Sequence, residues 1–174
     1  IRGNDINRWL GGNFALVRTM PNTPALFQSG VTGLFANDLV SIQQKELVTS
    51  ILSSVGECFW VDDEKLIDAI TAISGSGPAY FFLLIQSITQ AATALGLDEK
   101  TANSLSIQTS LGASLMATKS GKDSKTLRKE VTSPNGTTQA AIESFQDQNF
   151  EGIVAAATRA AYDRARELSN DLGD

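Results

Sequence analysis

The first 61 residues alternate short apolar runs with polar connections, a pattern typical of β-strands joined by turns and a helix. Three of these runs predict buried strands: residues 13–19 (NFALVRT), 30–37 (GVTGLFAN) and 57–61 (ECFWV). Between the last two, residues 41–56 have apolar positions at helical spacing, and we expect this helix to bury the side that carries Ile42, Leu47, Ile51, Leu52 and Val55. Strands and helices that alternate over short connections predict an α/β sheet.

Beyond about residue 65 the strand pattern stops, and long helical stretches fill the rest of the chain. Pro78 lies where a first helical position is expected, with Ser76 or Gly77 as the cap, and Gly96 is expected to end this helix. Further helices are predicted over residues 98–119, 124–131, 138–145 and 152–172. So many apolar helices would leave apolar faces exposed in a monomer, which predicts a dimer interface. A self-contained five-helix core is the alternative.

Charge and composition exclude several classes of function. The formal net charge is −5 and the basic residues form no cluster, so a nucleic-acid partner is not expected. Cys58 is the only cysteine, which excludes an intrachain disulfide and a thiolate metal cluster. The chain has no histidine, so catalysis by a histidine base is excluded, and we expect no metal site. Chemistry must therefore use hydroxyls, carboxylates, lysine, tyrosine or a cofactor.

One stretch has the length of a membrane span, because residues 69–97 contain no charged side chain. Its dense apolar part covers only residues 79–85, between glycine and proline on one side and polar residues on the other. This favours a buried helix of a soluble protein, without a membrane partner. The chain begins at Ile1 and shows no basic and apolar leader, so we expect a fragment without a secretory signal and a cytoplasmic location.

Two loops combine glycine or proline with polar residues in a way that suits a ligand. In residues 74–80 (SGSGPAY) two glycines precede an expected helix start, where free N–H groups and the positive end of the helix dipole can face an anion. Tyr80 stands where a dinucleotide fingerprint has its third glycine. Residues 20–30 (MPNTPALFQSG) follow the first strand, and their two prolines predict a rigid, extended loop at the carboxyl end of that strand, with Asn22 and Thr23 at its crest.

A third loop, within residues 130–145 (EVTSPNGTTQAAIESF), crowds small and hydroxylated residues ahead of a helix. Asn135 and Gly136 both tolerate a positive φ, and Thr137 and Thr138 lie where the helix is expected to begin. Such a loop gathers backbone N–H groups and hydroxyls around one point, which suits a small carboxylate. Ordinary capping and turn formation are the alternative for all three loops, and the residues alone leave it open.

Taken in order, VRTMPNTPALFQSG, SSVGECFWVDDEKLIDAITAISGSGPAYFF and LRKEVTSPNGTTQAAI resemble the carboxyl-terminal two thirds of the pyrroline-5-carboxylate reductases. The resemblance implies an α/β remnant of a Rossmann domain over residues 1–68 and an all-α helical dimerisation and substrate-binding domain over residues 69–174. The family's amino-terminal glycine fingerprint is absent from this sequence. The implied activity is an oxidoreductase reaction, the last step of proline biosynthesis, in which NADPH or NADH reduces the imine of 1-pyrroline-5-carboxylate to L-proline. The implied assembly is a homodimer, with dimers that assemble up to decamers.

The resemblance also implies roles for the three loops. The nicotinamide end of the cofactor would be lined by two stretches: Met20, Pro21, Asn22, Thr23 and Pro24, with Ser76, Gly77 and Pro78. Ser133 and the N–H groups near Gly136 and Thr137 would bind the substrate carboxylate. The Thr138 hydroxyl would contact the ring nitrogen and is the expected catalytic group.

The chain departs from the family pattern at three places. Asn135 stands where many relatives have a glycine, Lys129 stands where an acidic residue is common, and residues 121–126 (GKDSKT) replace a common acidic–His–Pro stretch. Two other functions stay open. A non-catalytic helical dimerisation fragment would dimerise without turning over a substrate. A related reductase of a β-hydroxy acid would be expected to use a lysine of the long helix as its proton donor, and residues 69–97 contain none.

Overall fold

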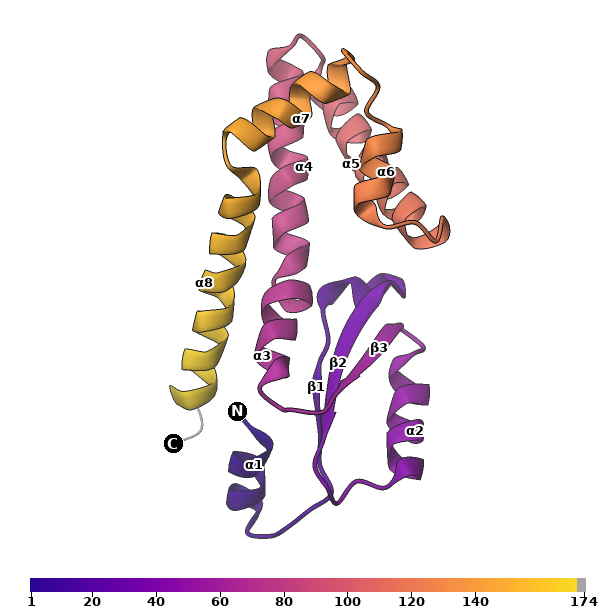
Figure 1. Ribbon diagram of the computed structural model, residues 1–174. Helices are drawn as coiled ribbons and strands as arrows, with labels where there is room; N and C mark the ends of the chain where they lie inside the picture. Colours follow the sequence, from indigo (N-terminus) through magenta and orange to yellow (C-terminus); the bar gives the residue numbers. More distant parts are fainter. Residues whose placement is uncertain (172–174) are drawn as a thin grey trace. The chain divides into compact units, whose positions relative to one another are not determined.

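The computed structural model describes residues 1–171, which form two compact units (Figure 1). The first unit consists of residues 1–79 with residues 155–171, and the second of residues 80–154. In chain order the elements are α1 (Gly3–Leu10), β1 (Val17–Met20), the 3-10 turn η1 (Thr23–Phe27), β2 (Gly30–Ala36), α2 (Ile42–Leu52), β3 (Gly56–Val61), α3 (Leu66–Ile70), the π-helical turn η2 (Thr71–Gly75), α4 (Gly77–Ala94), α5 (Glu99–Lys119), α6 (Ser124–Glu130), α7 (Thr137–Asp147) and α8 (Phe150–Asp171). An α/β region followed by helices alone confirms the predicted fold class. The predicted domain boundary after residue 68 stays a prediction.

The strands of the described chain form a mixed sheet in the first unit, in the order β1-β2-β3. β1 runs antiparallel to β2, with Met20 opposite Gly33, and β2 runs parallel to β3, with Gly30 opposite Gly56. The parallel pair is connected through α2, as a parallel connection requires. Leu34 of the central strand is fully buried, so the core of this unit lies at β2.

Helices cover both faces of this sheet. On one face α3 packs directly on β2, because a Cβ atom at Gly33 would lie only 2.6 Å from Ile70 Cδ1. Successive residues of a strand point to opposite faces, and Trp60 is paired with Leu34, the neighbour of Gly33. Trp60 Nε1 donates to Thr49 Oγ1 of α2 at 2.9 Å, so α2 lies on the second face.

Charged side chains connect α1, β1, α3 and α8 inside the first unit. Glu64 Oε1 accepts hydrogen bonds from the Gly3 N–H at 2.8 Å and from Arg18 Nη1 at 3.1 Å. Arg18 Nη2 lies 3.8 Å from Asp68 Oδ1, which also accepts from Ser169 Oγ of α8 at 3.2 Å. The Asp68 side chain is 3% exposed, so these side chains take the place of water as its partners.

α1 was not predicted from the sequence, and the predicted first strand begins earlier than β1 does. β1 begins at Val17 rather than residue 13. The preceding backbone is held by side chains instead of a strand ladder: the Leu16 N–H donates to Asn37 Oδ1 at 3.1 Å, and the Phe14 carbonyl accepts from Asn37 Nδ2 at 2.8 Å. The Phe14 N–H donates to Asn7 Oδ1 of α1 at 3.1 Å, which ties this segment to the helix that the sequence did not predict.

The predicted inner side of α2 is wrong. Ile42 is 72% exposed, and Leu47 and Ile51 are exposed as well, while Leu52 and Val55 are half-buried. α2 contacts the sheet through the polar side of the helix, where Thr49 bonds to Trp60. Ile42, Leu47 and Ile51 therefore lie on the exposed side of α2, although the predicted helix itself is present.

The later helices begin and end close to their predicted positions. α4 ends at Ala94 before Gly96, which has a φ of 103°, and α5 ends at Lys119 before Gly121, which has a φ of 68°. Glycine adopts such positive φ values without strain, which explains both ends. The predicted end of the last helix at Leu172 lies outside the described residues.

The second unit leaves most of its large apolar side chains exposed. Over residues 80–154, all of which the structure describes, only Ala102, Ser106 and Leu127 are buried, and Phe82 of α4 is 66% exposed. The expected burial of the apolar stretch 69–97 is therefore not met for residues 80–97 within one chain, whereas Ala72 and Gly77 in its first part are buried. By length and composition Leu66–Ala94 could cross a membrane, but a core helix of a soluble protein meets the same criterion, and 22% of the most apolar window is buried. A self-contained five-helix core does not fit this exposure.

We expect Arg18→Met to destabilise the first unit by ~3 kcal/mol, because it leaves two carboxylates, one of them buried, without their half-buried cation. The matched control is Arg164→Met, which breaks a pair between side chains that are each 60% exposed and should lower the stability by less than about 1 kcal/mol. Urea unfolding followed by tryptophan fluorescence measures both losses, since Trp9 and Trp60 lie in this unit. Equal losses for the two variants would show that the Arg18 network contributes no special stability.

Candidate functional site

The loop after β1 is fastened to the protein by the side chain of Asn22. Asn22 Nδ2 donates to the Ser74 carbonyl at 3.0 Å, and Asn22 Oδ1 accepts from the Val31 N–H at 2.8 Å. The loop is not extended as predicted, because residues 23–27 form the 3-10 turn η1 with Pro24 in its first turn. The side chain of Asn22 was also expected to be available to a ligand at the tip of this loop. Its amide instead binds the backbone of β2 and of the turn before α4.

The start of α4 is not the open helix terminus that the sequence predicted. The helical backbone continues from α3 through the π-helical turn η2, and Ser76 keeps right-handed helical angles. The Ser76 N–H donates to the Thr71 carbonyl at 2.8 Å, so it is not free for an anion. Pro78 has no N–H, which leaves the Ser74 carbonyl without the donor that an α-helix provides four residues later. Asn22 supplies the missing donor.

Gly75 allows the loop and the helix break to approach each other closely. A Cβ atom at Gly75 would lie 2.7 Å from Met20 Cε, so a larger residue would push Met20 away. Met20 and Asn22 thus lie beside the turn that leads into Ser76, Gly77 and Pro78. Turns of this π-helical type are frequent at functional sites. This one contacts residues 20–24 and leads directly into residues 76–78, the two stretches predicted to share a cofactor.

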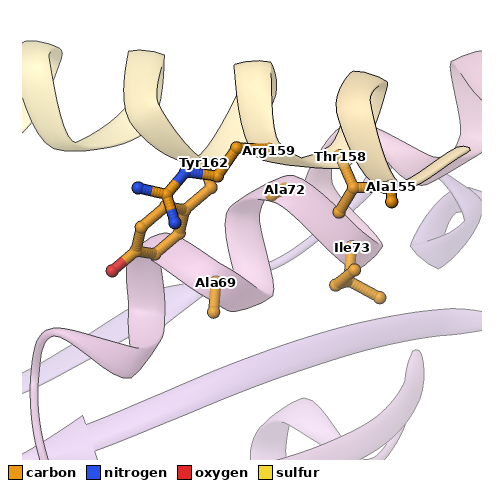
Figure 2. Close-up of a pocket in the computed structure, with 7 residues that line it drawn as sticks. All are labelled: Ala69, Ala72, Ile73, Ala155, Thr158, Arg159 and Tyr162. Atoms are coloured by element: carbon orange, nitrogen blue, oxygen red, sulfur yellow. The ribbon is translucent and has the colours of Figure 1, made fainter. Parts of the chain in front are cut away.

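Two cavities of the first unit lie next to this turn. The smaller has a volume of about 250 Å³ and an apolar lining, which consists of Val31, Phe59, Ala69, Ile70, Ile73 and Ser74. Val31 and Ser74 are the two residues whose backbone binds Asn22. The larger, about 460 Å³, lies between α8 and the segment formed by α3 and η2 (Figure 2), and its lining is Ala69, Ala72, Ile73, Ala155, Thr158, Arg159 and Tyr162. A hydrogen bond of 2.9 Å to Asp163 raises the pKa of Arg159 above its usual value. The larger cavity is therefore mainly apolar, with its cation already paired.

In the second unit, residues 133–136 form a tight turn. The Gly136 N–H donates to the Ser133 carbonyl at 3.1 Å, with Pro134 and Asn135 at the two central positions. The φ of Asn135 is 58°, a positive value of the kind that asparagine was expected to tolerate, and it matches the third position of a type II turn. Gly136, which would also tolerate a positive φ, has a φ of −89°. Glycine fits there because a Cβ atom would lie 2.5 Å from Ser133 Oγ.

This turn leads into α7 without a side-chain cap. Gly136 is the N-cap residue and offers no side chain, and α7 begins with Thr137 and Thr138, as predicted. Among the described residues, the hydroxyls of Ser133, Thr137 and Thr138 make no hydrogen bond. The capping alternative is therefore wrong for these three hydroxyls. The turn presents them together with first-turn N–H groups of α7, which lack intrahelical partners.

The two preceding helices of the same unit show the ordinary arrangement. Asp98 Oδ1 accepts from the Thr101 N–H at 3.0 Å at the start of α5, and Asp123 Oδ1 accepts from the Thr126 N–H at 2.8 Å at the start of α6. Hydrogen bonds from the Thr101 side chain and backbone lower the pKa of Asp98, and those from the Thr126 backbone and side chain lower the pKa of Asp123. Both caps are thus anions near neutral pH, whereas α7 starts without one.

Lys129, one of the departures from the family pattern, belongs to α6. It lines a cavity of about 550 Å³ between α6 and α7, which also contains Lys125 and Arg128. Within residues 1–171 there is no group of His, Cys, Asp and Glu side chains that could hold a metal ion.

Three residues that shape the loop 20–24 and the turn 133–136 were not predicted from the sequence. Ser74 and Gly75 form the contact surface for Asn22 and Met20, and Gln139 Oε1 accepts from the Asn135 N–H at 2.8 Å. One signal was present: a proline four residues after Ser74 leaves a carbonyl that needs another donor. No sequence pattern identified Asn22 as that donor.

Comparison with known proteins gives consistent matches. A family model described as pyrroline-5-carboxylate reductase dimerisation matches residues 64–168. A pyrroline-5-carboxylate reductase of Pseudomonas aeruginosa is 53% identical over 168 residues, which cover 97% of this chain and 62% of that protein. The solved reductase of Coxiella burnetii matches with a TM-score of 0.90 and 46% identity, over 94% of this chain and 60% of that one. The Plasmodium falciparum pyrroline carboxylate reductase, with NADP bound, matches with a TM-score of 0.88 and 31% identity, over 96% of this chain and 67% of that one. The chain spans about 60% of the length of the curated relatives it matches.

We predict that acid weakens the two aspartate caps. Their folded pKa values lie below the ordinary value of 3.8, so the stability that they contribute is present above that pH and is lost as the pH falls through the lowered folded pKa. The double variant Asp98→Asn, Asp123→Asn keeps a good cap residue that cannot titrate, and its acid-unfolding midpoint, measured by circular dichroism, should move to lower pH. The control variant Asp147→Asn, Glu46→Gln removes two exposed carboxylates that cap no helix and should move the midpoint less; an equal shift would contradict the capping account.

Proposed function

The chain belongs to the pyrroline-5-carboxylate reductase family, and from this premise we propose that it takes part in the reduction of 1-pyrroline-5-carboxylate to L-proline by NADPH or NADH. This reaction is the last step of proline biosynthesis and would place the protein in the cytoplasm. The observation that carries the proposal is the start of α7, where three hydroxyls and first-turn N–H groups meet without a capping side chain. A small cyclic acid is the kind of substrate that such a turn can hold.

The substrate side of the site is proposed to be the turn from Ser133 to Thr138. The Ser133 hydroxyl and the first-turn N–H groups near Gly136 and Thr137 would bind the carboxylate, at the positive end of the α7 dipole. The N–H of Gly136 itself closes the turn on the Ser133 carbonyl, so the Thr137 N–H is the nearest free donor of this set. The Thr138 hydroxyl would accept a hydrogen bond from the N–H of the protonated imine. An imine that is already protonated is an electrophile, so a hydroxyl that orients it can suffice where the chain has no histidine.

The cofactor side is proposed to lie in the first unit, at residues 20–24 and 76–78. Met20, Pro21 and Pro24 offer apolar surface, and the loop offers backbone groups, a combination that suits a flat nicotinamide ring rather than phosphates. When bound, the cofactor supplies the hydride. Thr23, Ser76, Gly77 and Pro78 would complete this lining. The Plasmodium relative that binds NADP supports a nicotinamide cofactor for this chain as well.

Self-association is proposed from the exposed apolar faces of the second unit. A second copy of the chain would cover the large side chains that α4 and α5 leave exposed, which include Phe81, Phe82, Leu105 and Leu111. The match to a dimerisation domain supports a homodimer. Further assembly of dimers, up to decamers, belongs to the same proposal.

We expect Thr138→Ala in the full-length protein to lower kcat for imine reduction by more than about tenfold, which corresponds to about 1.4 kcal/mol at the barrier. Thr137→Ala is the matched control, because it removes a neighbouring hydroxyl but keeps the backbone N–H proposed to bind the carboxylate, and its kcat should change by less than about threefold. Initial rates of cofactor oxidation measure both. An unchanged rate for Thr138→Ala would remove this hydroxyl from the mechanism, and a wild type inactive on pyrroline-5-carboxylate would leave the non-catalytic fragment or the β-hydroxy-acid reductase.

Light scattering at micromolar concentration, without detergent, should show at least a dimer. Phe82→Glu places a charge on the exposed face of α4 and should shift the protein toward monomers. Ile42→Glu alters an equally exposed residue of α2 and should leave the mass unchanged. A monomeric wild type would refute the proposed dimer, and a dimer insensitive to Phe82→Glu would place the interface elsewhere.

A further inference from the structure

We propose that Asn22 is a positioning residue that locks the loop 20–24 onto the break between η2 and α4, and that hydride transfer depends on this lock. The inference rests on the proposed function, because it assigns a role within the nicotinamide side of the same site. It also changes the expectation for Asn22: its side-chain oxygen binds the protein's own backbone rather than the cofactor.

The orientation of the Asn22 amide follows from its two partners. The Val31 N–H can only donate and the Ser74 carbonyl can only accept, so Oδ1 must face Val31 and Nδ2 must face Ser74. Both bonds are partly buried and have short distances, 2.8 Å and 3.0 Å. Asparagine is therefore needed for its combination of one acceptor and one donor on a short side chain.

The Ser74 carbonyl depends on this donor. Pro78 removes the N–H that would bind it in a regular α-helix. The hydroxyls of the same turn cannot replace it, because Thr71 Oγ1 donates to the Ile67 carbonyl at 2.8 Å and Ser74 Oγ donates to the Ile70 carbonyl at 3.1 Å. Loss of the Asn22 amide would leave a partly buried carbonyl without its side-chain partner, so the turn would rearrange.

Both ends of the lock are anchored to the sheet. Val31 belongs to the central strand β2, and the preceding helix α3 is fixed on the same strand by the contact between Ile70 and Gly33. Asn22 thus closes a ring that consists of the loop, the strand and the helix break. Catalysis by positioning is sensitive to shifts of about 1 Å. Residues 20–24 and 76–78 can therefore hold the nicotinamide in place only if the two hydrogen bonds of Asn22 persist.

The chain contains a matched control at the other end of β2. Asn37 also bridges two backbone groups with its amide, the Leu16 N–H at 3.1 Å and the Phe14 carbonyl at 2.8 Å. Asn37→Ala and Asn22→Ala therefore each remove one donated and one accepted amide hydrogen bond to the backbone of the same unit, although the Asn37 bond to Phe14 is exposed and both Asn22 bonds are partly buried. Only Asn22 lies beside residues proposed to bind the cofactor.

The experiment compares both variants in the full-length enzyme with the cofactor and pyrroline-5-carboxylate. Asn22→Ala should lower kcat by at least about tenfold while the KM for pyrroline-5-carboxylate stays within about threefold, and the primary isotope effect with a cofactor deuterated at the transferred position should rise. Asn37→Ala should change kcat by less than about twofold. Asn22→Asp should be impaired at neutral pH and recover relative to the wild type in acid, where a protonated carboxyl can donate to the Ser74 carbonyl.

A kcat of Asn22→Ala within about twofold of the wild type, or equal losses for Asn22→Ala and Asn37→Ala, would overturn the proposal. If the wild type fails to reduce pyrroline-5-carboxylate, the proposed function has failed instead. The lock itself is then tested by hydrogen exchange, in which Asn22→Ala should accelerate exchange of the Val31 and Ser76 amides and Asn37→Ala should not. Unchanged exchange of both amides in Asn22→Ala would refute the lock independently of activity.

Discussion

A carbonyl group that a proline deprives of its helical donor sets the local geometry of the first unit. Pro78 cannot bind the Ser74 carbonyl, and Asn22 binds it instead while it also holds β2. The same region has two close approaches that only glycine permits, Met20 over Gly75 and Ile70 over Gly33. Loop, strand and helix break therefore form one arrangement. The proposed cofactor side depends on it, because residues 20–24 and 76–78 flank this point.

The second unit differs from the first, because its helices form but leave most of their large apolar side chains exposed. The hydroxyls along one stripe of α5 donate to carbonyls four residues earlier: Ser106, Ser110, Ser114 and Thr118. Their polar groups are thus satisfied within the helix, so a second copy can cover them without leaving unpaired donors. The start of α7 differs, because its hydroxyls stay without partners. The α5 stripe can thus be buried without unpaired donors, and the start of α7 is where we propose that a polar ligand binds.

Much of the fold could be predicted from the sequence, but the contacts between elements could not. Gly96, Gly121 and Asp98 mark helix ends through local chemistry, so those ends were predictable. The inner side of α2 was not, because a helical spacing does not reveal which side meets the sheet. At the site, the positive φ of Asn135 followed from residue type. The π-helical turn and its bond to Asn22 join residues 52 positions apart, which no local pattern reports.

The most direct test of the account is a crystal structure of the full-length protein with L-proline and the oxidised cofactor. We expect the carboxylate of proline to bind the Ser133 hydroxyl and the first-turn N–H groups of α7 near Gly136 and Thr137, with the ring nitrogen near Thr138. The account also predicts that the nicotinamide lies against residues 20–24 and 76–78. Proline bound at a distant position, with the turn before α7 empty, would contradict it.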